Sequence, residues 1–252
     1  MRNLINIFFL LAVNIVTLFA QDPKQLFNEA NELYKQKEYE KAAQVYEKIA
    51  TLGYESAEVY YNLGNCYYKT NQTGLTILNY ERAKKIEPDN DDIEFNLRLA
   101  NLRVNDRIEA VPQMMLVVWF KNLLSSHTAN GWGKLSLVLL WLALTGSIVF
   151  LFSNKFLVKR ISFLTAIFLL LLSLLFLFVA YRQNRFEKNN KYGVVMVTNT
   201  YIKSAPENNA VDLFILREGV KAAILEENGE WQKIKLADGK VGWIQKNDME
   251  II

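Results

Sequence analysis

Two long runs without charge stand out in the pattern of hydrophobic and polar positions along the chain. Residues 135–154 and 161–181 contain no Asp, Glu, Lys or Arg. A helix rises ~1.5 Å per residue and the hydrocarbon core of a bilayer is ~30 Å thick, so each run is long enough to cross a membrane once. The pattern predicts transmembrane helices over 134–153 and 161–181, joined by a loop over 154–160 that is too short to hold a domain.

A helical hairpin returns the chain to the side from which it entered. Residues before Lys134 and after Arg182 are therefore expected on one side of the membrane. The alternative is a buried hairpin of a soluble protein, which needs a core large enough to surround about 40 apolar residues. A chain of 252 residues cannot supply such a core. The sequence thus predicts a multidomain membrane protein.

A third apolar run follows Arg2 and ends at Ala20. This is the layout of a secretory signal peptide over 1–20, which exports the residues that follow it. An uncleaved signal anchor is the alternative, because Leu18 is larger than the small residue usually found three positions before a cleavage point. Both interpretations place the next part of the chain outside the cytoplasm.

The short loop over 154–160 carries three basic residues, which the positive-inside tendency assigns to the cytoplasm. A basic linker over 182–190 follows the second helix and disagrees with this orientation. The first inserted element usually sets the orientation, so we give the signal precedence. The expected location is the bacterial inner (cytoplasmic) membrane, with the soluble parts facing the periplasm.

Residues 22–110 repeat themselves at a spacing of 34 positions. The equivalent positions are Phe27, Tyr61 and Phe95; Asn28, Asn62 and Asn96; Asn31 and Asn65; Tyr34 and Tyr68; Tyr46 and Tyr80; and Lys35, Lys69 and Arg103. A fixed 34-residue period of paired helices is typical of tetratricopeptide (TPR) repeats. The second copy resembles the TPR consensus at Leu63, Gly64, Tyr67, Tyr80, Ala83 and Pro88. The resemblance predicts an α-helical solenoid.

One further helix is expected over 91–104. Its apolar residues are Ile93, Leu97, Leu99 and Leu102. A terminal repeat must cover the last exposed face of a solenoid, so this helix is expected to cap the stack.

In TPR domains the first helix of each repeat lines a concave groove, and the resemblance implies such a groove here. Asn side chains offer a donor and an acceptor to an extended peptide, and Lys or Arg can hold a carboxylate. The alternative is that the tyrosines pack the stack and the lysines are solvated. The candidate partner-binding residues are Asn31, Tyr34, Lys35, Tyr61, Asn65, Tyr68, Lys69 and Arg103.

The segment over 111–133 is dense in apolar and aromatic residues. It is expected to form an amphipathic, membrane-proximal linker that lies at the lipid surface or contacts a partner helix. His127 lies among hydroxyl side chains, but the segment has no acidic residue to orient it, so catalysis by a Ser–His pair is not expected.

The tail over 191–252 changes to the alternation of β-strands. Its strands are broken at 227–229 and at Asp238-Gly239, and Asp-Gly between alternating strands is a strong hairpin signal. Five short strands within about 60 residues fit a small all-β barrel.

Three runs in this tail carry a resemblance to bacterial SH3-like (SH3b) domains. They are YIKSAP at 201–206, GEWQKI at 229–234 and DGKVGWI at 238–244. Such domains bind peptides or cell-wall fragments in a groove lined by aromatic side chains. The resemblance therefore implies that Tyr201, Trp231 and Trp243 bind a ligand, although in so small a barrel a Trp can equally belong to the core.

Composition narrows the function further. The net charge of +3 arises in residues 111–190, which carry 8 basic residues and 1 acidic residue, so the excess flanks the membrane and does not indicate a nucleic-acid partner. One cysteine, Cys66, and one histidine, His127, cannot form an internal disulfide or a His/Cys metal site. Cys66 is expected to be buried and inert. No cofactor, no metal and no enzymatic activity are expected.

The order of signal, TPR repeats, hairpin and SH3b tail, together with the runs at 92–101 and 106–109, resembles the BatE family. These are TPR/SH3b membrane proteins of the bacterial aerotolerance (Bat) operon. The resemblance implies protein partners, namely Bat-type membrane proteins with von Willebrand A domains that are linked to a MoxR-type ATPase. The sequence thus favours a non-enzymatic inner-membrane scaffold. The alternative is an envelope-stress sensor that binds peptidoglycan through the SH3b tail.

Overall fold

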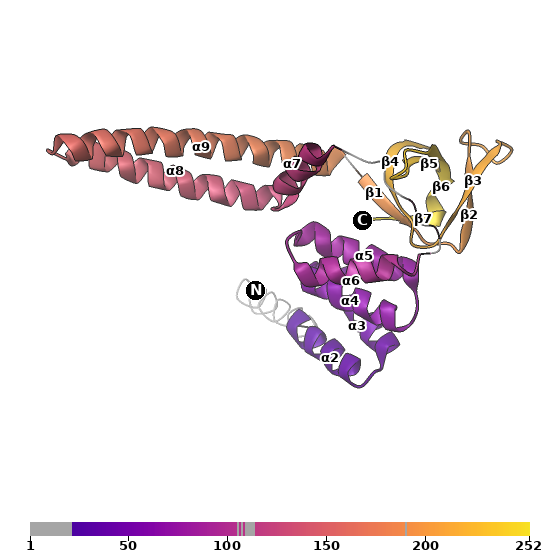
Figure 1. Ribbon diagram of the computed structural model, residues 1–252. Helices are drawn as coiled ribbons and strands as arrows, with labels where there is room; N and C mark the ends of the chain where they lie inside the picture. Colours follow the sequence, from indigo (N-terminus) through magenta and orange to yellow (C-terminus); the bar gives the residue numbers. More distant parts are fainter. Residues whose placement is uncertain (1–21, 105, 107, 109–113, 190) are drawn as a thin grey trace, which may run out of the picture.

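The computed structural model describes residues 22–104, 106, 108, 114–189 and 191–252. The predicted signal peptide over 1–20 lies outside the described residues, as do residues 109 and 110 at the end of the predicted repeat region and residues 111–113 of the predicted linker. Figure 1 shows three parts, which are a stack of short helices, a long pair of helices and a curved sheet.

The first part is the stack of short helices. Its members are α2 (Pro23–Lys35), α3 (Tyr39–Thr51), α4 (Ala57–Lys69), α5 (Thr73–Ile86) and α6 (Asp91–Asn101). Each helix packs against the next, as the 34-residue period predicts. Side chains cap three of the helices: Asp22 accepts from the N–H of Lys24 at 3.0 Å, Ser56 from that of Val59 at 3.2 Å and Asn90 from that of Asp92 at 3.1 Å.

Equivalent residues of the two repeats pack the interior of the stack. Tyr46 and Tyr80 are buried, and a Cβ added at Gly64 would lie 2.6 Å from the ring of Tyr80. Glycine is thus favoured here because the Tyr80 ring of the second helix approaches the first helix so closely. Of the four apolar residues named for the predicted capping helix, Ile93 and Leu97 are buried, whereas Leu99 and Leu102 are exposed.

The reason lies in the helical period of α6. Ile93, Leu97 and Ala100 fall on one face and are buried against the stack. Leu99 and Leu102 fall on a different face, since residues three and four apart share a side of a helix.

The second part consists of α7 (Met115–Ser125), α8 (Ala129–Phe152) and α9 (Phe156–Asn189). By length and composition, α8 and α9 are two helices that could cross a membrane. They lie side by side and run in opposite directions (Figure 1). Helix α8 begins before the predicted limits of 134–153 and ends one residue short of them, whereas α9 extends beyond the predicted 161–181 at both ends. In α7 and just before it, residues 114–119 all expose apolar side chains.

The third part is a single antiparallel sheet. Its strands are β1 (Lys191–Val195), β2 (Asn199–Lys203), β3 (Asp212–Arg217), β4 (Lys221–Asn228), β5 (Trp231–Lys235), β6 (Val241–Gln245) and β7 (Met249–Ile251). Their order is β3-β2-β6-β5-β4-β1-β7. Seven strands are present where five were expected, and no pairing between β3 and β7 closes the sheet within 191–252. The expected closed barrel is therefore corrected to a curved, open sheet.

The helix stack and the sheet share one hydrophobic core. Ile77 of α5 and Val104, just after α6, belong to the same buried cluster as Val194, Val195 and Val220. Figure 1 shows α5 beside β1 and β7, although more than 100 residues separate these elements in the sequence. The helix stack before the hairpin and the sheet after it thus pack against each other.

Candidate functional site

The predicted binding residues of the repeats lie on α2 and α4, the first helices of two successive repeats, and Arg103 lies in the turn just after α6, the first helix of the next repeat. We call the side of these helices that carries positions 27, 31, 34 and 35 and their 34-residue equivalents the first-helix surface. This surface continues from one repeat to the next. Asn96 of α6 donates to two residues of α4, the hydroxyl of Tyr61 at 2.7 Å and Oδ1 of Asn65 at 3.3 Å. Sequence reasoning did not select Asn96 as a site residue, although it belongs to the repeat series at 28, 62 and 96.

Asn31 and Asn65 each connect the two helices of their own repeat. The hydroxyl of Tyr46 donates to Oδ1 of Asn31 at 2.6 Å, and that of Tyr80 donates to Oδ1 of Asn65 at 2.7 Å. Burial raises the pKa of both tyrosines, so these hydroxyls stay protonated and act as donors. The amide oxygens therefore hold the repeat together, which leaves the amide NH₂ groups as the part that could meet a ligand.

The three basic residues at the ends of the first helices differ in how firmly their side chains are held. Lys35 pairs with Glu32 at 2.7 Å, but both side chains are mostly in water, so this pair contributes little. Lys69 is exposed. The guanidinium of Arg103 stacks on the ring of Tyr68, 3.5 Å from its centroid, and donates to the Tyr68 carbonyl at 2.9 Å. Arg103 is thus the positioned cation of the series.

An exposed apolar stripe on α6 and the residue that follows it is the strongest feature of the first-helix surface. Phe95 is 59% exposed, Leu99 38% and Leu102 67%. Their spacing puts them on one face, next to Arg103 at the end of the helix. The sequence predicted only that the helix with these apolar residues caps the stack. The 34-residue register, which aligns Leu99 with Asn65 and Leu102 with Tyr68, is the signal that could have identified the two leucines as surface residues.

The three aromatic residues predicted in the sheet share one face. In the register, Lys203 lies opposite Trp243, Lys233 lies opposite Trp243, and Trp231 lies opposite Gln245. Side chains alternate along a strand, so Tyr201, Trp231 and Trp243 point to the same side. Tyr201 is 55% exposed and Trp231 is half-buried, whereas Trp243 is 9% exposed. A ligand on this face would reach the first two more readily than the third.

The surroundings of Trp243 explain its burial. The ammonium of Lys233 lies 5.7 Å from the centre of the Trp243 ring, and Lys203 on the neighbouring strand forms an ion pair with Asp212 at 2.5 Å. Long lysine stems can cover an aromatic ring while their charges stay in water.

His127 has an acidic neighbour that the sequence did not reveal. Its Nδ1 lies 2.9 Å from Oδ2 of Asp89, in the loop between α5 and α6. The expectation that no acid contacts His127 is therefore corrected, since it considered only residues 111–133. The His127 ring also packs at a tilt against Trp132, with 5.3 Å between the ring centroids, and Trp132 in turn packs at a tilt against Phe176 of α9 at 5.2 Å. The pair thus links the helix stack to the hairpin.

Within the described part of the chain, no group of three or more His, Cys, Asp or Glu side chains could hold a metal ion. Cys66 is fully buried, as predicted, and burial raises the pKa of its thiol to about 12. A thiol with so high a pKa is a poor nucleophile at neutral pH.

Comparison with known proteins identifies one part of this arrangement. The tetratricopeptide repeat family model matches residues 57–90, which include α4 and α5. The match assigns a repeat rather than a family for the whole chain. Similar solved structures include the type III secretion translocator chaperone SycD of Yersinia enterocolitica, which is 18% identical with a TM-score of 0.29 and covers 58% of this chain and 87% of its own. Its complex with a peptide of the translocator YopD is 19% identical with a TM-score of 0.30 and covers 60% and 92%. No curated protein matches the chain.

Proposed function

We propose that this protein is a non-enzymatic membrane scaffold that binds a protein partner along its first-helix surface. The observation that carries the proposal is the exposed stripe of Phe95, Leu99 and Leu102 beside the positioned Arg103, next to a matched TPR repeat. An apolar stripe on a soluble surface usually marks an interaction site. The fitting partner is a protein segment with apolar side chains and at least one carboxylate, which Arg103 can bind.

The proposed location is a bacterial inner membrane, with α8 and α9 spanning it as a hairpin. Their length and composition support this, and the basic residues between 154 and 160 support a cytoplasmic loop. The helix stack and the sheet then face the periplasm. The exposed apolar residues at 114–119 suit contact with membrane lipid at the surface.

The proposed partners are Bat-type membrane proteins with von Willebrand A domains, which act with a MoxR-type ATPase. This part of the proposal rests on the resemblance in the order of repeats, hairpin and tail to the BatE family of aerotolerance proteins.

Co-purification from detergent-solubilised membranes tests the binding surface. Leu102→Glu places a charge in the stripe and should reduce the recovered partner about tenfold or more, because central apolar anchors carry most of an interface's energy. Leu52→Glu is the matched control, since Leu52 is also an exposed leucine that follows the last residue of a helix, in this case α3. Equal recovery from both variants, or no partner with the wild-type chain, contradicts the proposal.

A second candidate function is cell-wall binding by an envelope-stress sensor. The observation that favours it is the shared face of Tyr201, Trp231 and Trp243. The full chain should then sediment with purified peptidoglycan, and Trp231→Ala should abolish sedimentation while circular dichroism stays unchanged. A wild-type chain that does not sediment rules out this function.

A further inference from the structure

One side of α5 is fully engaged by the sheet. Gly74, Ile77, Glu81, Arg82 and Lys85 each contact the strands or turns of residues 191–252. Their spacing follows the helical period, so together they form one face. We call this face the sheet-facing side of α5. It does not overlap the first-helix surface, which lies on α2, α4 and α6.

The centre of this contact is apolar and closely fitted. Ile77 is buried in the same cluster as Val195 and Val220. Gly219, in the turn between β3 and β4, has φ +90°, and an added Cβ would lie 3.0 Å from Ile77 Cδ1 and 3.1 Å from Val104 Cγ2. Only glycine combines this backbone conformation with so close an approach. The turn is thus shaped for the helix stack.

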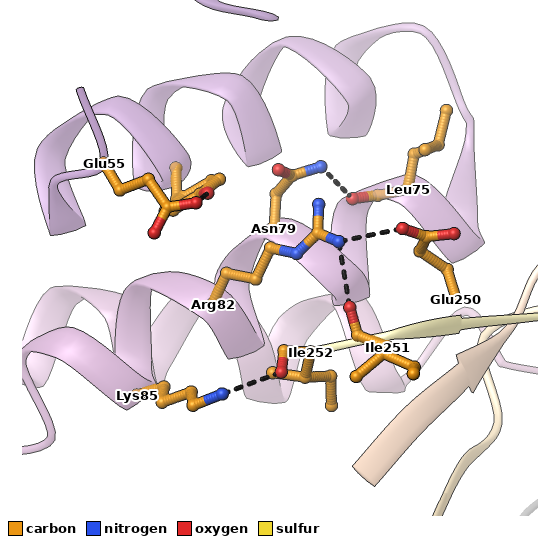
Figure 2. A network of polar contacts seen from close by, with 9 residues as sticks. Glu55, Leu75, Asn79, Arg82, Lys85, Glu250, Ile251 and Ile252 are labelled. Atoms are coloured by element: carbon orange, nitrogen blue, oxygen red, sulfur yellow. Dashed lines mark hydrogen bonds and ion pairs between the residues drawn. The ribbon is translucent and has the colours of Figure 1, made fainter. Parts of the chain in front are cut away.

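Charged groups surround this apolar centre. The ammonium of Lys221 lies 2.6 Å from Oε2 of Glu81, whose side chain is only 11% exposed. In Figure 2, Arg82 bridges Glu250 at 3.1 Å and the carbonyl of Ile251 at 2.9 Å, and Lys85 donates to the carbonyl of Ile252 at 2.8 Å. At each of these contacts a positively charged side chain meets a carboxylate or a carbonyl oxygen, which fixes the position of the sheet on the helix.

A further ion pair lies at the point where the chain leaves the helix stack. Asp106 accepts from the backbone N–H of Arg217 at 2.8 Å and from its guanidinium at 2.7 Å. This two-point contact ties the segment after α6 to the sheet. It lies two residues beyond Val104, whose side chain is part of the shared core.

A short TPR stack needs such a partner. Repeats bury their faces against neighbours, so about three are needed for stability and the terminal face must be covered. Here α2 to α6 form two helix pairs and a single helix. The sheet covers an apolar side of the second pair that a further structural unit would otherwise have to cover.

From these contacts we infer that the helix stack and the sheet form one composite body, with residues 105–190 inserted into it. The sheet is the stabilising partner of the second repeat. Both ends of the insertion lie on the same side of the membrane, so it contains an even number of spans. The first-helix surface and the aromatic face of the sheet move together. The inference goes beyond the proposed function and holds even if neither surface binds a partner.

A cysteine pair tests the inference in the full chain. A Cβ at Gly74 would lie 2.9 Å from Cγ of Glu218. The β-carbons of two cysteines at these positions are therefore within about 4.5 Å, which is the range of a disulfide. Gly74→Cys with Glu218→Cys, in a Cys66→Ala background, should form an intramolecular disulfide in isolated membranes under mild oxidation. The matched control pairs Glu218→Cys with Gln44→Cys on the exposed side of α3 and should stay reduced.

Two outcomes overturn the inference. One is a Gly74→Cys/Glu218→Cys chain that is present in the membrane but keeps both thiols free. The other is cross-linking of the control pair to the same extent. If Gly74→Cys prevents the protein from accumulating, a second pair replaces it, namely Glu81→Cys with Lys221→Cys. A short bismaleimide should cross-link this pair, because the native side chains meet at 2.6 Å. Failure of that pair to cross-link also overturns it.

Discussion

The side-chain carboxylate of Glu218 accepts a hydrogen bond from the backbone N–H of Gly74 at 2.6 Å, although 144 positions separate the two residues. Gly74 is the second residue of α5, and the residue before this helix, Gln72, makes no side-chain cap. The first turn of a helix has N–H groups without helical partners and carries a partial positive charge. Glu218 thus caps α5 from the sheet, a role that Asp22, Ser56 and Asn90 fill locally for other helices.

Glu218→Ala should therefore loosen the start of α5. Loss of a capping side chain costs about 1 kcal/mol, so the amides of the first turn should exchange with solvent about fivefold faster. Hydrogen exchange of the full chain in detergent measures this directly. Glu230→Ala is the control, because Glu230 is an exposed acid on the same sheet that lies in the turn before β5. Equal exchange at Gly74 in both variants contradicts the capping role.

Local periodicity explains what the sequence could predict. The 34-residue spacing gave the helix pairs and the burial of Tyr46 and Tyr80, because these depend on positions a few turns apart. The two apolar runs predicted helices of membrane-spanning length. Contacts such as Glu218 with Gly74, or His127 with Asp89, join segments that have no shared pattern, so spacing cannot reveal them.

The candidate sites were predicted less completely than the fold. Asn31 and Asn65 do lie on the first helices, but their oxygens are occupied by tyrosine hydroxyls. Leu99 and Leu102 were named only as apolar residues of a capping helix, because hydrophobicity alone does not tell which face of a terminal helix is covered; both are exposed. The closed barrel was expected from a strand count, and strand count does not determine whether the end strands pair.

Gly64→Ala should destabilise the second repeat. Alanine favours a helix over glycine by about 1 kcal/mol. The added Cβ, however, would lie 2.6 Å from the Tyr80 ring, which is buried and held by Asn65. Overpacking of this kind costs about 1–3 kcal/mol, so a net loss of about 1 kcal/mol is expected and the thermal midpoint should fall by several degrees. Circular dichroism of the full chain in detergent measures this thermal midpoint.

The matched control for this variant is Gly133→Ala. Gly133 is also a helical glycine, in α8, but a Cβ there meets nothing within 4 Å. This change should leave the midpoint unchanged or raise it slightly. A Gly64→Ala chain that is as stable as the control contradicts the close approach of α4 and α5.

Ser136→Ala should loosen the hairpin. The hydroxyl of Ser136 donates to the carbonyl of Ser173 at 2.9 Å, and the hydroxyl of Ser173 donates back to the carbonyl of Ser136 at 2.9 Å. Interhelical hydrogen bonds in membranes contribute about 1 kcal/mol, which corresponds to about a fivefold change in opening. A cysteine at the buried Ala166, in a Cys66→Ala background, should then react with a maleimide about fivefold faster.

Ser147→Ala separates this effect from the loss of any hydroxyl. The Ser147 hydroxyl donates at 2.9 Å to the Ala143 carbonyl of its own helix, so its removal breaks no bond between α8 and α9. The labelling rate should stay at the wild-type value. If both serine variants accelerate labelling equally, the reciprocal pair does not hold the hairpin.

The stability of the protein should fall at alkaline pH because of Cys66. Burial raises the pKa of this thiol from 9.0 to about 12 in the folded chain. Above pH 9 the unfolded chain releases the thiol proton while the folded chain retains it, so the unfolded state is favoured as the pH rises. At pH 10 this linkage amounts to about 1.4 kcal/mol, and the loss continues until the pH reaches the folded pKa. Below pH 9 this contribution vanishes.

Cys66→Ala lacks this thiol, so chemical unfolding at pH 8, 9 and 10 should show a smaller loss of stability in the variant than in the wild-type chain. Buried tyrosines such as Tyr46 and Tyr80 add their own loss near pH 10 in both chains. An ionised Cys66 would raise the pKa of both tyrosines, but the folded thiol stays protonated up to pH 10, so this coupling does not separate the two chains over the pH range measured. Parallel stability curves for the two chains between pH 8 and 10 would mean that the Cys66 thiol ionises as readily in the folded protein as in the unfolded one.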